Sequence, residues 1–508
     1  MDALVLSLAP DWAVRHAAAL IVALPMILAP IAVVFSSERL SWFLSIVASV
    51  ASTLFALILL AQVRDGGVVS YALGGWEPPF GIEFRIDSLN ALILLLVSAV
   101  GVLAVIFSRP TVTAEIRQEK RAYFYAAYMV CFCGLLGVAA TGDAFNLFVF
   151  LEISSIATYV LVALGARRDR RALPAAFSYL IMGTIGASFY VIGVGFLYAA
   201  TGTLNMADIA TRLPELGDSR TVQAGFAFIV VGLGLKAAMW PLHQWLPGAY
   251  AHAPSFVTVF LSATATKVAI YALARFVFSV FSFDFAMDSA GFVYLLAPLS
   301  LAAMVACSFQ AIFQSDIRRM LAYSSVAQVG YILLGVALGT ALGLSAGLLH
   351  LINHALMKGA LFMAVAALVL TYQGARLNDF EGAARGAPLT MTAFGIAALS
   401  LIGVPLTAGF QSKIALLNAV LAEGWWWAAM IIVFSSLLAV VYMGRVLEAV
   451  FFKPPANPTK ARKEAPAAIL VPLWILAIAN IWIGFDASVP ATLANEAAAA
   501  VIGSGSAR

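Results

Sequence analysis

The stretch that decides the fold is Gly343-Leu-Ser-Ala-Gly-Leu-Leu-His350-Leu-Ile-Asn-His354-Ala-Leu-Met-Lys358-Gly-Ala-Leu-Phe-Met-Ala-Val-Ala-Ala-Leu-Val-Leu-Thr371. Apolar residues fill most of it, and about 20 of them in a helix cross a hydrocarbon core about 30 Å thick. Two histidines and a lysine interrupt the run at i, i+4 and i+8, so they share one helix face over about 12 Å. We therefore expect a membrane-spanning helix that carries a row of titratable groups.

Similar apolar runs recur along the whole chain. Of its 508 residues, 63% are hydrophobic and only 11% are charged, more apolar surface than a soluble core needs. The fold class is therefore an all-α integral membrane protein, for which we predict 14 transmembrane helices. The predicted spans are residues 17–36, 40–62, 88–108, 122–141, 144–164, 174–200, 221–247, 255–279, 290–313, 320–340, 343–371, 389–421, 425–451 and 466–485.

The basic residues of the loops predict the orientation of the chain. Most loop Lys and Arg residues follow odd-numbered spans, and the densest group lies between Arg167 and Arg171. Because cytoplasmic loops are enriched in basic residues, we expect these loops in the cytoplasm and both termini outside. The longest connection, residues 63–87, is rich in turn-forming residues and predicts an interfacial hairpin.

Four lysines remain inside the predicted spans with apolar residues on both sides: Lys236, Lys267, Lys358 and Lys413. A charged ammonium at mid-membrane costs several kcal/mol. Glu152 is the only carboxylate well inside a predicted span, so it cannot neutralise all four. We infer that some of these lysines are neutral part of the time or face water, and that they exchange protons.

These residues also have simpler interpretations. Glu152 could be a buried carboxyl satisfied by serine or backbone groups, or it could pair with a buried lysine. His350 and His354 could bind zinc at their i, i+4 spacing, but the pattern supplies no third ligand and Lys358 is adjacent. We favour a proton relay, because histidine titrates near neutral pH.

Two predicted spans contain helix breakers near a lysine, in Gly232-Leu-Gly-Leu-Lys236-Ala-Ala-Met-Trp-Pro241-Leu-His243 and in Gly403-Val-Pro405-Leu-Thr-Ala-Gly409-Phe-Gln-Ser-Lys413. The backbone groups freed by a break are tolerated in a membrane only inside protein or beside water. Each break could be a proline kink for packing, but two at corresponding places indicate an inverted-repeat transporter. His243 and His252 flank the end of the first broken span, as proton relay groups or as plain helix caps.

The cysteines argue against a metal or cluster site. Cys131, Cys133 and Cys307 form no CxxC pair, so we expect small buried side chains. The chain also lacks a Rossmann glycine fingerprint and a nucleotide loop. We therefore expect no cofactor, no metal, no nucleic-acid partner and no redox chemistry by this chain alone.

Several motifs stand out together along the chain: Gly142-Asp143-Ala-Phe-Asn146-Leu-Phe-Val-Phe-Leu-Glu152, Gly234-Leu-Lys236-Ala-Ala, Pro241-Leu-His243-Gln-Trp-Leu-Pro247, Ala253-Pro254-Ser255, Thr266-Lys267-Val268, Asp316-Ile-Arg-Arg-Met-Leu-Ala-Tyr-Ser-Ser325 and Asn353-His354-Ala-Leu-Met-Lys358. With these motifs the chain resembles the antiporter-like subunit family, which includes the large membrane subunits of respiratory complex I and of Mrp-type multisubunit sodium/proton antiporters. Two further stretches, Tyr71–Gly81 and Leu197–Ala207, resemble the D branch of the Mrp antiporter subunits. The chain departs from the usual family pattern at Gly248, His252 and Phe256.

The resemblance implies a fold with two inverted five-helix repeats, each containing a broken helix. It also implies roles: Glu152 and Lys236 as a coupled pair, Lys267 between the halves, His354 and Lys358 along the central axis, and Lys413 at its end. His350 and His243 are weaker candidates. The expected organisation is N-terminal helices in 1–121, repeats in 122–279 and 290–451, and a cytoplasmic loop, last helix and external tail in 452–508.

The function that these features predict is a proton-translocating subunit of a sodium/proton antiporter, a transporter rather than an enzyme. The expected location is the bacterial cell membrane, multi-pass, and the expected partners are other subunits, the lipid bilayer, protons and sodium. The alternatives are a proton-pumping subunit of a redox complex, such as an NADH:quinone oxidoreductase or a membrane-bound hydrogenase, and a passive structural subunit. Four buried lysines argue against the passive role.

Overall fold

The computed structural model describes residues 2–217, 219–282, 285–286, 291–372, 374–455 and 464–506. Residues 456–463 of the expected cytoplasmic loop lie outside the described residues. Almost all described elements are helices. They are α1 (Asp2–Leu8), α2 (Asp11–Phe35), α3 (Glu38–Gly66), β1 (Val69–Ala72), β2 (Glu83–Ile86), α4 (Ser88–Glu115), α5 (Arg121–Ala140), α6 (Ala144–Ala163), α7 (Ala172–Thr201), α8 (Met206–Arg212), α9 (Arg220–Lys236), α10 (Trp245–His252), α11 (Ser255–Ala263), α12 (Ala265–Arg275), α13 (Phe292–Ile312), α14 (Ile317–Ala337), α15 (Ala341–Tyr372), α16 (Pro388–Ile402), α17 (Ala408–Ala422), α18 (Trp426–Leu447), α19 (Ala467–Phe485) and α20 (Ser488–Ser506).

Within the described residues, 12 helices are long and apolar enough to span a membrane. Each coincides with one predicted span. The other two predicted spans, 221–247 and 389–421, are the ones that contain helix breakers. The span 389–421 divides into α16 and α17. In the span 221–247, α9 ends at Lys236, and α10 begins at Trp245 and continues past the predicted end to His252. The breakers therefore interrupt the helix where the sequence predicted, and 14 complete spans remain a prediction.

Aspartate side chains define where several spans begin. Asp87 accepts hydrogen bonds from the backbone of Leu89 and Asn90 at the start of α4. Asp143 and Asp316 cap α6 and α14 in the same way. An N-cap satisfies backbone donors that have no partner within the helix, so each aspartate separates a loop from a membrane-spanning helix.

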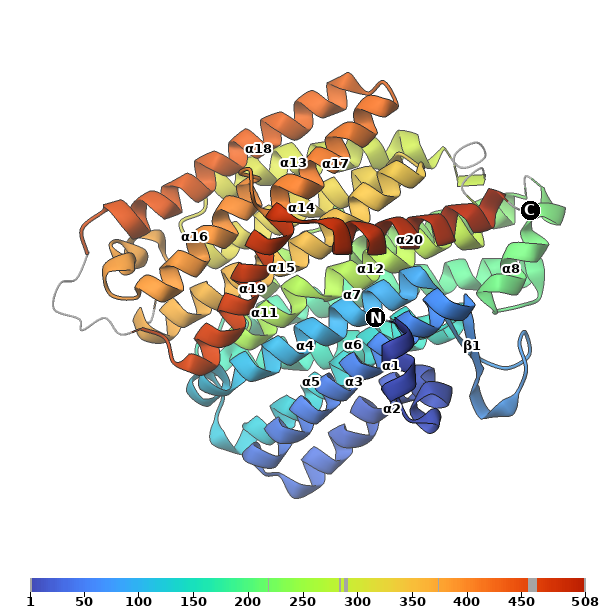
Figure 1. Ribbon diagram of the computed structural model, residues 1–508, viewed down its shortest axis with the longest axis horizontal. Coiled ribbons are helices and arrows are strands. Elements are labelled where there is room, and N and C mark those ends of the chain that lie inside the picture. The colour runs from blue at the N-terminus through green and yellow to red at the C-terminus, as the bar shows by residue number, and fades with distance from the viewer. Residues whose placement is uncertain are drawn as a thin grey trace.

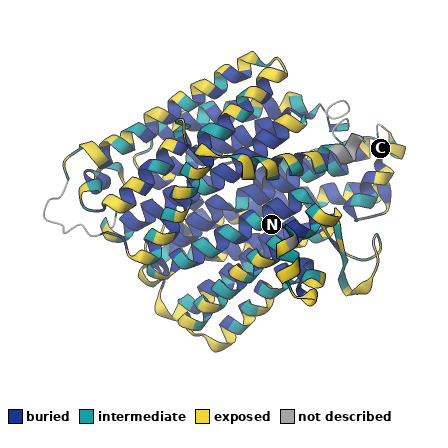
Figure 2. Cartoon of the chain, viewed as in Figure 1, coloured by how far each residue is buried: buried dark blue, intermediate teal, exposed yellow. Residues whose placement is uncertain are grey.

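Figure 1 shows the long helices running roughly parallel, with the N-terminal helices on one side, α13, α16, α17 and α18 on the other, and α11, α12 and α15 between them. The central helix α15 packs against α11, α14, α16, α17, α19 and α20. Buried residues therefore gather along the middle of the molecule, whereas exposed residues lie at both ends and around the rim (Figure 2). Many exposed rim residues of α6, α7 and α18 are large and apolar, as a bilayer requires.

Two smaller elements complete the fold. The predicted hairpin is confirmed: β1 pairs antiparallel with β2, with Val69 opposite Ile86. Residues 488–506, expected as a tail, instead form α20, which packs against α4 and α15. The buried residues Ala494, Ala497, Ala498 and Val501 lie on one face of α20. Alanine gives a weak apolar signal in sequence, which explains why the helix was missed.

Candidate functional site

The predicted pairing of Glu152 with Lys236 is present. Glu152 lies in the middle of α6 and Lys236 is the last residue of α9, where the break begins. Lys236 Nζ lies 3.3 Å from Glu152 Oε1 and donates a 2.6 Å hydrogen bond to Ser155 Oγ. The Lys236 side chain is 7% exposed and that of Glu152 is 23% exposed. The break thus places an ammonium against a carboxylate between two neighbouring helices.

Lys267 lies beside a helix interruption that no proline or glycine in the sequence predicted. Thr264, between α11 and α12, has φ −125° and ψ −59°, outside helical geometry. The fully buried Lys267 Nζ donates to the carbonyl oxygen of Ser262 in the last turn of α11. Carbonyls in the last turn of a helix have no partner within it, so the interruption supplies an acceptor for the ammonium.

Lys413 uses the second predicted break in the same way. Its Nζ donates to the carbonyl oxygens of Leu401 at 3.1 Å and Ile402 at 2.8 Å, at the C-terminal end of α16. It also lies 3.1 Å from Ser436 Oγ. The C-terminal end of a helix carries partial negative charge, which suits a cation.

Lys358 is fully buried on α15 and reaches α14. Its Nζ donates to the Leu321 carbonyl oxygen at 2.8 Å and to Ser324 Oγ. Within the described chain, neither Lys358 nor Lys267 nor Lys413 has a carboxylate within ion-pair distance. Glu152 therefore neutralises only Lys236, and the other three ammonium groups rely on carbonyl and hydroxyl oxygens.

Ring contacts connect the two histidines of α15 to Lys413. The ring centroids of His350 and His354 are 6.4 Å apart and nearly parallel. The Tyr331 ring lies 5.3 Å from that of His350 and 5.1 Å from Lys413 Nζ. The structure therefore connects Lys413, Tyr331, His350 and His354 in sequence across α17, α14 and α15.

The two histidines differ in their hydrogen bonds. His350 pairs at 2.9 Å through one ring nitrogen with Gln328 Oε1 and through the other with Ser412 Oγ. His354 is fully buried, and neither ring nitrogen makes a hydrogen bond within the part of the chain that the structure describes. His350, the weaker candidate in sequence, is thus firmly held inside the row.

The candidate residues fall into two groups. Lys267 lies within electrostatic range of His350, His354 and Lys358, so these belong to one group with Lys413. Glu152 and Lys236 form the other, and no hydrogen bond or ring contact among the described residues joins the two. His243 is buried in the loop after α9, where its Nε2 lies 3.9 Å from Cys307 Sγ, and it contacts neither group in that way.

The sequence interpretation missed most of the partners, because serine, tyrosine and glutamine are common in the spans and nothing marked these as special. It also missed two buried carboxylates, one at the end of α4 and one at the start of β2. Glu115, the last residue of α4, lies 2.5 Å from Arg168 and accepts hydrogen bonds from the backbone N–H and hydroxyl of Ser255. Glu83 accepts from Ser70 and Asn205.

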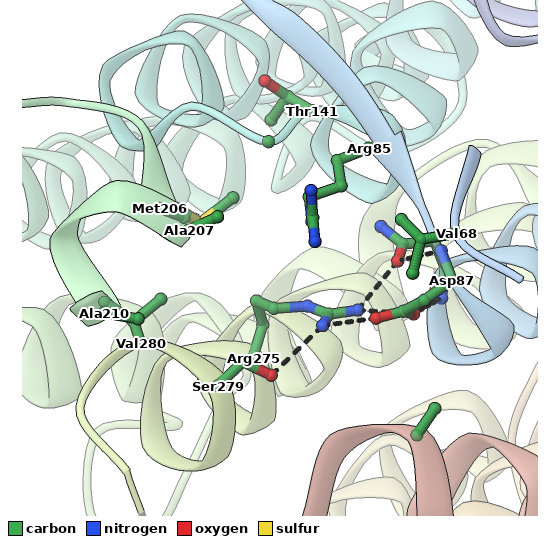
Figure 3. A pocket seen from close by; sticks show the side chains of 13 residues that line it. Val68, Arg85, Asp87, Thr141, Met206, Ala207, Ala210, Arg275, Ser279 and Val280 are labelled. Carbon is green, nitrogen blue, oxygen red and sulfur yellow. Dashed lines mark hydrogen bonds and ion pairs between the residues drawn. The ribbon is translucent and has the colours of Figure 1, made fainter. Parts of the chain in front are cut away.

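A second charged cluster lies at the opposite end from the Arg167–Arg171 loop, beside the β-hairpin. Arg275, two helical turns after Lys267 on α12, makes a bidentate ion pair with Asp87 at 2.6 and 2.7 Å. Figure 3 shows Arg85 and Arg275 both pointing into a cavity of about 270 Å³. Asp87 thus has two roles: it caps α4, and it neutralises the largely buried guanidinium of Arg275.

Comparison with known proteins places the chain among membrane subunits of two kinds of complex. It is 43% identical to the N subunit of the NADH-quinone oxidoreductase of Desulforudis audaxviator, over 84% of this chain and 87% of that protein. It is 29% identical to the D subunit of the Na(+)/H(+) antiporter of Bacillus subtilis, over 90% and 92% respectively.

Solved structures give the same result. A chain of the Mrp complex from Dietzia sp. DQ12-45-1b matches with a TM-score of 0.88 and 27% identity, and a chain of the archaeal membrane-bound sulfane sulfur reductase matches with 0.87 and 34%. Both comparisons cover 96% of this chain and 97% of the other. The family model "NADH:quinone oxidoreductase/Mrp antiporter, TM" matches residues 141–439. As the sequence motifs predicted, this chain belongs to the antiporter-like membrane subunit family shared by NADH:quinone oxidoreductases and Mrp antiporters.

Proposed function

We propose that this chain translocates protons, which pass between buried lysines, histidines and Glu152 within the membrane. The observation that carries the proposal is the surroundings of Lys267, Lys358 and Lys413, whose described partners are carbonyl and hydroxyl oxygens. A buried lysine without a counter-ion releases its proton more easily than an ion-paired one, because burial opposes the charge. Such lysines can therefore take up a proton and pass it on.

The two groups have different roles in this proposal. Glu152 and Lys236 form a switch, because the strength of their ion pair depends on whether a proton is present. Within the second group, Lys267 lies close enough for its charge to influence whether His354 and Lys358 hold protons. Lys413 ends the row. His243 remains a candidate for passing protons along the first broken span.

The proposed architecture around this row follows the family fold. We propose that the divided segments 221–247 and 389–421 each complete a membrane crossing, which gives 14 spans, and that residues 122–279 and 290–451 are the two inverted repeats. The breaks after α9 and α16, each next to a buried lysine, support this proposal, because they fall at corresponding places in the two halves of the chain. Both termini then lie outside the cell membrane of a bacterium.

Glu152 supports the view that the chain works inside a multisubunit complex. On α6, Phe145, Val149 and Ile156 are exposed and lie on the same face as the partly exposed Glu152, before the last turns of the helix. A carboxylate facing hydrocarbon at mid-membrane is costly. We therefore propose that a partner subunit covers this face.

We propose a monovalent cation/proton antiporter, exchanging sodium, as the parent complex, as for the Bacillus subtilis relative. A redox-driven parent is the second candidate. Its support is the higher identity of this chain to the NADH-quinone oxidoreductase relative and to the sulfane sulfur reductase chain, 43% and 34%. Both parents use the same proton row and differ in what drives it.

Reconstitution of the assembled complex in liposomes that contain a pH-sensitive dye tests the function. We expect proton movement driven either by a sodium gradient or by an electron donor with quinone, and the effective driving force identifies the parent complex. The purified chain alone should be inactive, because Glu152 then lacks its covering partner. Robust transport by the chain alone would refute the need for partners, and a complex inert under both conditions would refute proton transport.

The orientation is tested by thiol labelling of intact cells. The three natural cysteines are buried, so they provide a silent background. Arg167→Cys lies in the loop before α7 and Arg220→Cys begins α9, so α7 separates the two positions by one membrane crossing. We expect an impermeant reagent to label Arg220→Cys only. Labelling of Arg167→Cys from outside would reverse the topology.

A further inference from the structure

A basic groove lies at the end of α6 and the start of α7, apart from the buried row. It has a volume of about 690 Å³ and is lined by the four cations Arg117, Lys120, Arg167 and Arg170, and by no carboxylate. It extends from the loop between α4 and α5 to the loop between α6 and α7. Neither loop belongs to the residues that hold Glu152 or Lys236.

Most of this positive charge is uncompensated. Within the described residues, Arg117 is 3.6 Å from Glu119, an exposed pair of the kind that contributes little. Lys120, Arg167 and Arg170 have no ion-pair partner there. The nearby carboxylates are engaged elsewhere, Glu115 with Arg168 and Asp169 with Arg171. The groove therefore attracts an anion.

The remaining lining is apolar. Ile116, Val160, Leu164 and Leu173 contribute to it, and Val160 and Leu173 are 49% and 53% exposed. Val160 lies in the last turns of α6, so its exposed side faces the acyl-chain region. The cations lie in the segments that connect the membrane-spanning helices, beyond the ends of the α-helices. A ligand that fits both parts carries a negative charge next to a hydrocarbon chain.

We propose that this groove binds an anionic phospholipid, with its phosphate between the Arg and Lys side chains and its acyl chains along Val160 and Leu173. Basic pockets between membrane helices recognise anionic headgroups in this way. A zwitterionic headgroup fits less well, because its ammonium group would face four cations. Arginine also matches the oxygens of a phosphate with its planar donors.

The test uses the assembled complex, freed of loosely bound lipid, in native mass spectrometry with added phosphatidylglycerol or phosphatidylcholine. We expect preferential binding of phosphatidylglycerol. Arg167→Gln/Arg170→Gln should weaken the binding of one phosphatidylglycerol molecule roughly 25-fold, because each basic residue near a membrane surface contributes about 1 kcal/mol to the binding of an anionic lipid. The matched control Arg319→Gln/Arg385→Gln, which removes two exposed cations at the start of α14 and just before α16, should not change binding.

Two further measurements distinguish a lipid from the other possible ligands of the groove. Inorganic phosphate is added alone: phosphate binding that the double variant abolishes, without lipid preference, would overturn the lipid assignment in favour of a free anion. Loss of a subunit from the Arg167→Gln/Arg170→Gln complex would overturn it in favour of an acidic partner protein. Equal phosphatidylglycerol binding by wild type and the double variant would overturn the site itself.

Discussion

Replacing either Glu152 or Lys236 with alanine is expected to abolish proton transport by the assembled complex while the chain still inserts into the membrane. The two side chains are 3.3 Å apart on different helices. Removing one leaves the other buried without its partner, and burial then favours the neutral form of the remaining group. A pair that no longer changes its charge cannot pass a proton, so we expect transport to fall roughly 100-fold or more.

The controls separate this role from a structural one. Glu152→Asp keeps the charge and should retain partial transport. Ser155→Ala removes a hydroxyl that accepts from Lys236 at 2.6 Å but leaves the ion pair, so it should reduce transport less than either alanine variant of the pair. The double alanine variant should be no worse than the single ones, because residues that act as a unit are not additive. Wild-type rates in both single alanine variants would show that the pair is structural.

The features of the fold that follow from one helix at a time could be predicted from sequence. The i, i+4 spacing of His350 and His354 predicted one helix face, and their rings lie 6.4 Å apart. The proline and glycine pattern around Lys236 and Lys413 predicted the two breaks. These predictions rest on helical periodicity and backbone chemistry, which do not depend on neighbouring helices.

The partners across helices could not be predicted in the same way. Whether Lys358 meets Ser324, or Tyr331 meets His350, depends on how two helices rotate against each other. That rotation is set by packing of the whole bundle. The interruption at Thr264 also lacked a signal, because no proline or glycine stands there. The interruption supplies the Ser262 carbonyl oxygen that accepts from Lys267. The sequence therefore predicted the buried lysine but not its hydrogen-bond acceptor.

His354 offers the sharpest distinction between a proton carrier and a core residue. Its imidazole is fully buried and makes no hydrogen bond within the described part of the chain. Replacing it with leucine, an apolar side chain of similar size, therefore strands no described polar partner. We expect the free energy of unfolding to change by about 1.5 kcal/mol or less, whereas proton transport should fall roughly 100-fold.

His350→Leu is the matched control, one helical turn away on the same face of α15. It removes the described partner of the buried Gln328 Oε1, whereas the buried Ser412 hydroxyl can still donate to the carbonyl oxygens of Ala408 and Gly409. A stranded polar group costs about 1–3 kcal/mol, so this variant should lower the thermal unfolding midpoint of the purified complex as well as transport.

Measuring the unfolding midpoint and dye-reported proton transport on both variants decides between the two roles. If His354 served only in packing, its replacement could stop transport only by lowering the stability of the protein. Loss of transport at unchanged stability therefore identifies a proton carrier. If His354→Leu transports protons at the wild-type rate, the row does not pass through His354. The connection from Lys267 would then run through Lys358 or His350, the other two groups of α15 in its electrostatic range, both of which contact α14.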